Sequence, residues 1–260
     1  YDLVAPFVWS GAGPETVIVP VDQKTVLEQK AVFAELTYEV NEQLSATVGM
    51  RHFDYDQEFD DFNRPENNEK KESGQTYKAS LSYAPNDDLL IYGQWVEGFR
   101  LGQAAATPPA ACDTDNNGIL DDVGFADPGP LASDSSENFE LGLRASLLDN
   151  RATLNVAIYR INWEGMPVSI SLPSCASTVR LNAGESKSEG VEVEFQARLT
   201  EQLQLDVSAS YGEATLTEDA ENLGVKGDNL PGSADFNTTV ALQYDFTLDD
   251  RDAFARIDYA

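Results

Sequence analysis

The stretch VEVEFQARLTEQLQLDVSASY, residues 191–211, decides how this chain folds. Apolar side chains occupy every second position from Val191 to Leu199 and again from Leu203 to Tyr211, with mostly polar side chains between them. A period of two over about ten residues is the pattern of a β-strand with one apolar face. Only three residues separate the two runs, so we predict a tight hairpin of two long antiparallel strands.

The same alternation recurs along the chain. It is clear at Phe139–Leu147 and Phe236–Phe246. Weaker copies run through Val32–Val40, Leu44–Met50, Tyr77–Tyr83 and Ala255–Tyr259. The composition of Leu89–Phe99 and Leu154–Trp163 also predicts strands, although the sequence does not indicate which of their faces points outward. We therefore expect an all-β fold of about ten strands.

The links between these strands alternate in length. Tight links lie at Asn41-Glu42, Pro85–Asp88, Leu148–Arg151, Thr200–Gln202 and Thr247–Asp252. Long loops are expected at about residues 54–74, 101–136, 165–178 and 217–232. Because a turn of a few residues joins antiparallel neighbours, this series predicts an up-and-down meander with its small turns on one rim and its large loops on the other. Outer-membrane barrels have this asymmetry.

Strand length and charge favour a membrane barrel over a soluble domain. Strands in soluble proteins are most often five or six residues long, whereas a tilted strand needs about nine to eleven residues to cross a bilayer. Charged residues such as Glu192, Glu194 and Arg198 lie in mid-strand, which suits a wide aqueous lumen. The alternative is a soluble, secreted sandwich or a β-rich adhesin whose polar face meets solvent.

The chain reads as one unit, and we expect it to be part of a larger one. No run of eighteen apolar residues occurs, so a helical membrane span is excluded. The sequence begins at Tyr1 without a start methionine and stops at Ala260 within a strand. We therefore expect residues 1–260 to be a partial barrel that does not fold alone, because an open sheet has two long unpaired edges.

The chain is strongly acidic, with 45 acidic against 17 basic residues and a formal charge of −28. Phosphate binding needs the opposite sign, so nucleic acid is an improbable partner. An acidic rim attracts cations, but a solvated, aggregation-resistant surface is the better explanation for most of these carboxylates. No nucleophile–base pair, zinc spacing or phosphate-binding glycine loop appears, so we do not expect an enzyme or a catalytic residue.

Two cysteines, Cys112 and Cys175, lie in long loops on the same expected rim. An even number of cysteines in an exported chain favours a disulfide between neighbouring outer loops, and two free thiols are the alternative. The only histidine, His52, lies near a strand end with no reason to meet either thiol.

The acidic segment at residues 113–122 is the sharpest local motif. Oxygen ligands at alternate positions followed by a glycine are typical of calcium loops. The candidate ligands are Asp113, Asp115, Asn117, the carbonyl of Ile119, and Asp121. The acidic residue expected at the twelfth position is replaced by Gly124, and Asp122 is the substitute in a tighter loop. A metal-free acidic turn remains the alternative, and any bound calcium would be structural rather than a required cofactor.

Four blocks in order carry a resemblance to the TonB-dependent outer-membrane receptors. The first is IYGQWVEGFR at residues 91–100, which resembles the strand with a Gly-Phe-Arg ending in that family. The next hairpin is matched by SENFELGLR at residues 136–144 together with LNVAIY at residues 154–159. The last two blocks are NAGESKSEGVEVE at residues 182–194 and Leu230-Pro231-Gly232.

The resemblance implies the central-to-late part of a 22-strand transmembrane barrel in a bacterial outer membrane. It implies a separate plug domain, absent here with the terminal strands, and import of a scarce solute with energy from the TonB complex. The solute would be an iron–siderophore complex, cobalamin or an oligosaccharide, bound partly by outer loops whose contact residues do not transfer by position. A passive porin-like channel is the runner-up.

Some residues that match the family's pattern, and some aromatic residues, have structural interpretations. We interpret Gly98, Gly184 and Gly190 as sites of bends or close packing, and we expect Arg100 and Glu192 to pair across the lumen. Aromatic residues near strand ends are candidates for the two membrane interfaces, and ordinary strand preference accounts equally well for most of them. They are Trp9, Tyr38, Tyr83, Trp163, Tyr211, Tyr244 and Phe246.

Overall fold

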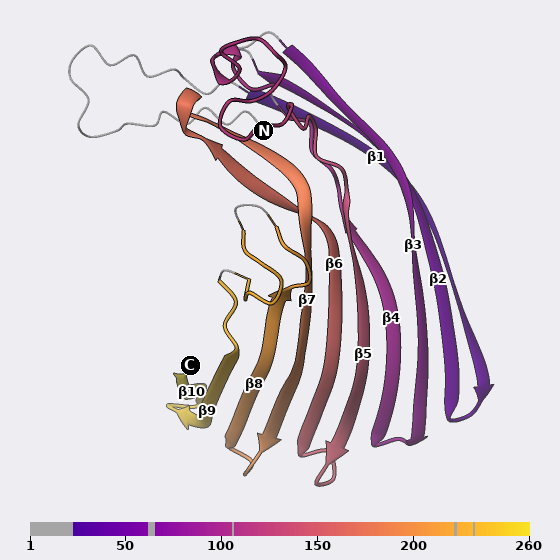
Figure 1. The fold of residues 1–260 in the computed structure, drawn as a ribbon. Helices are drawn as coiled ribbons and strands as arrows, with labels where there is room; N and C mark the ends of the chain where they lie inside the picture. The colour runs from indigo at the N-terminus through magenta and orange to yellow at the C-terminus, as the bar shows by residue number, and fades with distance from the viewer. Residues whose placement is uncertain (1–22, 62–65, 106, 221–222, 231) are drawn as a thin grey trace.

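The computed structural model describes residues 23–61, 66–105, 107–220, 223–230 and 232–260. These residues form one ten-stranded antiparallel sheet in which each strand pairs with its neighbours in the chain, as Figure 1 shows. The prediction of an all-β meander of about ten strands is therefore confirmed. The sheet is curved, with its short turns at one end and its long connections at the other.

The elements have the following bounds. The strands are β1 (Gln23–Asn41), β2 (Leu44–Asp61), β3 (Glu66–Asn86), β4 (Leu89–Arg100), β5 (Asp134–Leu147), β6 (Ala152–Leu172), β7 (Ser177–Arg198), β8 (Leu203–Leu216), β9 (Phe236–Leu248) and β10 (Arg251–Tyr259). Two 3-10 turns complete the set, η1 (Ala110–Cys112) and η2 (Pro173–Cys175). Among the described residues no helix has the length and apolar character needed to cross a membrane.

Two predicted loops are mostly strand. β2 continues to Asp61 and β3 begins at Glu66, so most of the predicted loop 54–74 is a paired hairpin. β6 likewise continues to Leu172 and β7 begins at Ser177, which leaves little of the predicted loop 165–178. These segments lack a continuous apolar face, but the backbone ladder satisfies their polar groups without one.

The strand register shows which side chains share a face. Residues directly opposite each other in a ladder project to the same side of a sheet, and the register runs without a shift along β5, β6, β7 and β8 below the rim. Ile91 lies opposite Leu143, and Leu143 lies opposite Val156, so the apolar residues of β4 and β6 join the apolar face. This resolves the outward side of Leu89–Phe99 and Leu154–Trp163, which the sequence alone left open.

The apolar face is not covered by other described residues. Leu36 is 68% exposed, Leu141 and Ile158 are each 58% exposed, and Ile257 is 70% exposed. Soluble proteins rarely expose an apolar surface that extends over a whole sheet. A second protein layer, as in a sandwich, is therefore absent from the described part of the chain.

The apolar face ends at a line of polar residues. Moving from the short turns toward the long connections, the outward positions are mainly apolar up to Met50, Trp95, Phe139 and their equivalents. The next outward position on each strand from β1 to β8 is polar or charged. We call these residues the polar row: Lys30, His52, Gln75, Glu97, Glu137, Arg160, Glu189 and Glu213.

The opposite face is mainly polar, and glycines there make room for large side chains. A Cβ atom at Gly190 would lie 2.6 Å from the Tyr159 hydroxyl oxygen, and one at Gly184 would lie 2.7 Å from the Met166 methyl carbon. Both glycines therefore serve close packing. Trp163 also lies on this face, under Arg100, so its predicted place at a membrane interface is wrong. Trp9 lies outside the described residues, and the other five predicted aromatics share the apolar face.

The buried core lies at the rim of long connections rather than within the sheet. One cluster of buried residues comprises Cys112, Leu120, Val168, Ile170, Leu172 and Val179. A second comprises Met166, Leu216 and Ala220. The rim therefore folds around its own interior, as a small globular unit does.

Candidate functional site

The candidate functional site is this rim. It consists of the β2–β3 and β6–β7 hairpins beyond the polar row, the connection from β4 to β5 at residues 101–133, and the described part of the β8–β9 connection. We call the connection from β4 to β5 loop 101–133. Figure 1 shows loop 101–133 and the β6–β7 hairpin at the end of the sheet opposite the short turns.

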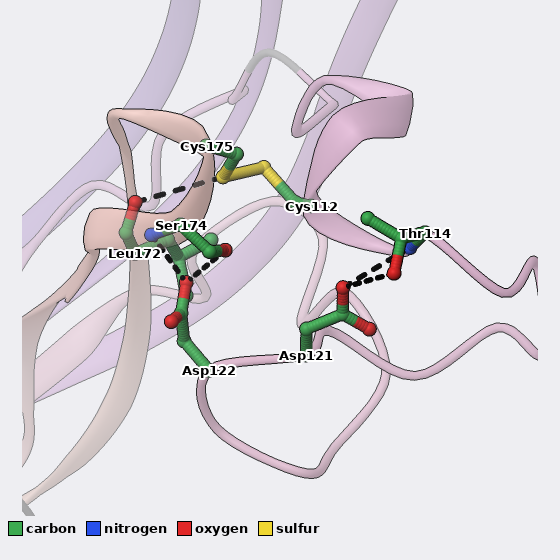
Figure 2. Close-up of a disulfide and its surroundings, with 7 residues drawn as sticks. All are labelled: Cys112, Thr114, Asp121, Asp122, Leu172, Ser174 and Cys175. Carbon is green, nitrogen blue, oxygen red and sulfur yellow. Dashed lines mark hydrogen bonds between the residues drawn. A yellow bond between two sulfur atoms is a disulfide. The ribbon is translucent and has the colours of Figure 1, made fainter.

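A disulfide joins loop 101–133 to the β6–β7 hairpin. Cys112, at the end of η1, is bonded to Cys175 in η2; the two residues are 63 positions apart in sequence and their Cα atoms are 5.1 Å apart (Figure 2). Cys112 is almost fully buried and packs with Leu120, Val168 and Leu172. Both predicted cysteines thus meet on the predicted rim, and the structure holds no free thiol among its described residues.

Polar contacts reinforce this junction on both sides. The carboxylate of Asp122 accepts hydrogen bonds from the Ser174 backbone N–H at 3.1 Å and from its hydroxyl at 2.5 Å (Figure 2). Farther along the loop, the side-chain oxygen of Asn182 accepts the Ala132 backbone N–H at 2.8 Å. The Asn182 amide nitrogen donates to the Ala132 carbonyl at 3.0 Å and to the Gly165 carbonyl at 2.8 Å.

Glu72 ties loop 101–133 to the β2–β3 hairpin. Its carboxylate accepts hydrogen bonds from the Tyr55 hydroxyl at 2.6 Å, from the Ser133 backbone N–H at 3.0 Å and from the Ser133 hydroxyl. Lys70 lies 2.8 Å from its other oxygen. Burial opposes ionisation of Glu72, but these donors outweigh it and lower the pKa to about 2.

Tyr55 is held in its neutral form by the same contact. Burial and the hydrogen bond to the Glu72 carboxylate raise the pKa of the Tyr55 hydroxyl to about 12. Over the whole physiological pH range, Glu72 is therefore ionised and Tyr55 is neutral.

Arg100 forms a different ion pair from the one expected. Its guanidinium binds the buried carboxylate of Asp134 and lies 5.1 Å from the centre of the Trp163 ring. The predicted pairing of Arg100 with Glu192 is therefore wrong. Asp134 begins β5 directly opposite Arg100 at the end of β4, so the shorter contact is made within one rung of the sheet.

The predicted calcium motif is partly assembled. Carboxylate oxygens of Asp113, Asp115 and Asp121 lie within 4.8 Å of one another. The Asn117 side-chain oxygen accepts the Ile119 backbone N–H at 2.7 Å, and its nitrogen donates to Asp115 at 2.9 Å. The donor set of three carboxylates has the hard oxygen chemistry that calcium prefers. Asp122 is bound to Ser174 instead and is not a substitute ligand, so that expectation is wrong.

Several residues of the rim gave no signal in the sequence. Glu72 and Ser133 are 61 residues apart, and Asn182 and Ala132 are 50 residues apart. Their side-chain types are ordinary for loops and strand ends, so only the fold brings them together. Asp134 pairs with Arg100 across the β4–β5 ladder, but it lies inside the predicted loop 101–136, so no sequence signal linked the two residues.

Comparison with known proteins identifies the chain's relatives. A family model described as TonB dependent receptor-like, beta-barrel matches residues 5–260. A probable TonB-dependent siderophore receptor, PiuA of Acinetobacter baumannii, is 23% identical over 150 residues, which cover 56% of this chain and 18% of that protein. The metal-pseudopaline receptor CntO of Pseudomonas aeruginosa is 28% identical over 160 residues, covering 59% of this chain and 22% of that protein.

Solved structures share the fold. The ferric yersiniabactin uptake receptor FyuA from Yersinia pestis superposes with a TM-score of 0.68 and 18% identity, covering 92% of this chain and 34% of that one. The siderophore receptor PiuA from A. baumannii gives a TM-score of 0.65 and 19% identity, covering 86% and 32%. This chain thus spans about a fifth of the curated relatives and a third of the solved chains. The family match over nearly its whole length shows that the chain belongs to the TonB-dependent receptor β-barrel family.

Proposed function

We propose that this chain forms part of the wall of an outer-membrane transporter that imports an iron–siderophore type complex with energy from TonB. The observation that carries the proposal is the single sheet with one uncovered apolar face and one polar face, in a chain of this family. The names of the relatives support the solute class, because PiuA is described as a probable siderophore receptor, FyuA as a ferric yersiniabactin uptake receptor and CntO as a metal-pseudopaline receptor. This family consists of transporters rather than enzymes.

In the proposed placement, lipid contacts the apolar face and the polar row marks its outer boundary. On β8 the apolar run from Leu203 to Tyr211 covers nine residues, the number that a tilted strand needs to cross the hydrocarbon. Aromatic residues lie at both ends of the apolar face, with Tyr211 and Phe236 toward the long connections and Tyr244 and Phe246 toward the short turns. Such belts are typical of membrane interfaces. The long connections then face outside and the short turns face the periplasm.

The remaining parts of the transporter belong to the longer protein. A 22-strand barrel would supply partners for the free edges of β1 and β10, and a plug domain would contact the polar inner face and the TonB complex. The rim with loop 101–133 would then be part of the outer vestibule through which the solute enters. Nucleic acid is not a partner in this scheme, since the chain is strongly acidic.

Uptake by the full-length protein in a strain that lacks its own copy tests this function. Cells are supplied in turn with radiolabelled ferric hydroxamate, ferric catecholate and mixed-ligand siderophores, with cobalamin, and with a maltodextrin. We expect one class of ferric siderophore to accumulate, and only when TonB is present. Accumulation without TonB would indicate a passive porin-like channel instead. Fractionation of the protein with soluble secreted material rather than with membranes would indicate an adhesin or binding domain.

We further propose that calcium binds loop 101–133 through Asp113, Asp115 and Asp121. The convergence of three carboxylates supports this site, and the ion would stiffen the loop beside the Cys112 junction. In the full-length protein we expect calcium to raise the thermal stability of the loop, and Asp115→Asn to remove that effect. Asp127→Asn, in the same loop but outside the cluster, is the matched control. An equal melting temperature in calcium and in EDTA would contradict the site.

A further inference from the structure

The sheet is split between β3 and β4 from the polar row to the strand ends nearest the long connections. The β3–β4 ladder ends at Lys78 and Val96, whereas β2–β3 continues to Asp60 and β4–β5 continues to Arg100. Loop 101–133, which follows β4, binds the β2–β3 hairpin across the split: Ser133 is bound to Glu72, and the Ala104 backbone N–H donates to Gln57 at 2.6 Å.

The two sides of the split overlap rather than meet edge to edge. By register, Phe53 is on the inner, polar face of β2, whereas Phe99 is on the outer face of β4. Their rings nevertheless stack, with centroids 3.7 Å apart and planes within 1° of parallel. The inner face of the β2–β3 hairpin therefore lies against the outer face of β4, and a pocket of about 600 Å³ lies between them. That volume falls within the range of about 300–1,000 Å³ that is usual for small-molecule sites.

The pocket is lined by groups that accept and donate hydrogen bonds, next to the stacked rings. Among the described residues, Glu137, Glu164 and the hydroxyls of Ser135 and Ser136 have no side-chain partner. Glu97 accepts the Tyr77 backbone N–H at 2.9 Å. Among the described residues no lysine or arginine lines the pocket, and the nearby Arg100 is bound to Asp134.

This lining selects a class of ligand. Glu97 and Glu137 are directly opposite in the β4–β5 ladder, an arrangement that like charges make unfavourable. A ligand with several O–H donors would relieve the repulsion between Glu97 and Glu137 by bridging their carboxylates. An anionic ligand would be repelled. Serine hydroxyls, which both donate and accept, match ligand hydroxyls in the same way. Phe53 is buried beneath Phe99, and the partly exposed ring of Phe99 supplies an apolar surface for a ring face. Glu97 and Glu137 also belong to the polar row, so the pocket opens at the outer surface of the wall.

We propose that the split between β3 and β4 is a binding site for a saccharide ring. The sugar has two possible sources, a glycolipid of the surrounding outer leaflet or a glycosylated solute. The site does not depend on the import function, because sugar binding needs neither TonB nor an energised membrane.

Binding is tested on the full-length receptor purified in a zwitterionic detergent, since glycoside detergents would compete. The probes are maltose, lactose and N,N′-diacetylchitobiose, and binding is measured by saturation-transfer NMR and calorimetry. We expect at least one sugar to bind and Glu164→Gln to weaken it at least five-fold, since Glu164 is exposed and the change keeps its shape. Glu201→Gln, at a short turn on the opposite rim, should bind as the wild type does.

Three results would overturn the site. They are the absence of binding for all three sugars, equal sugar affinity in Glu164→Gln and the wild type, and spermidine binding ten-fold more tightly than any sugar, which would indicate a polyamine site. Two further measurements separate the sources. A glycolipid source predicts that lipid co-purifies with the wild type and less with Glu164→Gln. A solute source predicts that the bound sugar competes with the imported solute. Failure of iron uptake alone would leave the sugar result intact.

Discussion

The sheet between the short turns and the polar row, which we call the apolar band, and the rim are stabilised in different ways. In the band, each strand pairs with its neighbours through one backbone ladder, and its apolar side chains remain exposed. In the rim, loop 101–133 is held to its neighbours by a disulfide, a buried apolar cluster and individual side-chain hydrogen bonds. The band is built for a surrounding apolar solvent, whereas the rim makes its own interior, as a water-soluble protein does.

This contrast predicts how each region responds to change. A substitution in the band matters through the direction in which its side chain points, because the two faces meet different solvents. A substitution in the rim matters through the specific contact that is lost. Variants of the full-length protein can test both rules.

Removal of the disulfide has the largest expected effect. In the chain-entropy model, a cross-link that closes a loop of this length contributes about 4 kcal/mol. The double variant Cys112→Ser with Cys175→Ser should therefore show much faster amide hydrogen exchange in residues 101–133 and 166–181. Exchange in β8 should be unchanged. Equal acceleration in both regions would show that the rim and the band unfold as one unit.

A charge on the apolar face comes next. Val207 lies midway along the apolar run of β8, and Ser208 is its neighbour on the polar face. Arginine at the midplane of a lipid-facing surface costs about 2–4 kcal/mol. Val207→Arg should lower the free energy of unfolding in lipid bilayers by that amount, and Ser208→Arg by less than about 1 kcal/mol. Equal costs at the two positions would argue that neither face meets lipid.

Loss of the Glu72 contact should affect only the rim. Hydrogen bonds to a charged group contribute about 1.5–3 kcal/mol, so Glu72→Gln should loosen loop 101–133 by a similar amount. The pKa of Glu72 is about 2 in the folded protein, below the ordinary value of 4.5. The contribution is therefore complete above about pH 4.5 and is lost as the pH falls toward 2.

The pH dependence of loop 101–133 sharpens this test. Hydrogen exchange in the loop, corrected for the intrinsic rate, should accelerate as the pH falls from 4.5 to 2 in the wild type. The Glu72→Gln variant should show a smaller change. At the other end, the raised pKa of Tyr55 predicts that the contact weakens as the pH rises from about 10 to 12. If hydrogen exchange in the loop changes equally in the wild type and in Glu72→Gln between pH 4.5 and 2, Glu72 is not the group responsible.

The smallest effect is expected at the polar row. Arg160 and Glu189 are 3.4 Å apart, and both side chains are about half exposed. Exposed ion pairs contribute between zero and about 1 kcal/mol. A double-mutant cycle with Arg160→Gln and Glu189→Gln should give a coupling energy in that range. A coupling well above it would indicate that the row is desolvated and lies deeper than its place in the sheet implies.

Much of the fold was predictable because the band obeys a simple period. The runs Val191–Leu199 and Leu203–Tyr211 alternate without a break, and both lie in strands of the observed sheet except Leu199, which directly follows the end of β7. The extensions of β2, β3, β6 and β7 were missed because their hydrogen-bonded ladders continue beyond the apolar face. Their polar or irregular sequences therefore resemble loops, and nothing in a single sequence distinguishes the two.

The rim was predictable only where the chemistry is local or the residue type is rare. Two cysteines in a chain of this size predict a disulfide between them, and an alternating Asp pattern is visible over ten residues. Glu72, Asn182 and Asp134 are common residue types, and their partners lie 61, 50 and 34 residues away. Their roles depend on the sheet register and on the path of loop 101–133, which no local pattern specifies.

The central claim is that the apolar face meets lipid while the face behind it meets water. Spin labels placed one at a time at positions 203–211 of β8, in the full-length protein in bilayers, test it most directly. We predict that accessibility to oxygen peaks at the odd positions, and that accessibility to a water-soluble nickel reagent peaks at the even ones. Uniform accessibility along the strand, or the opposite alternation, would contradict the account.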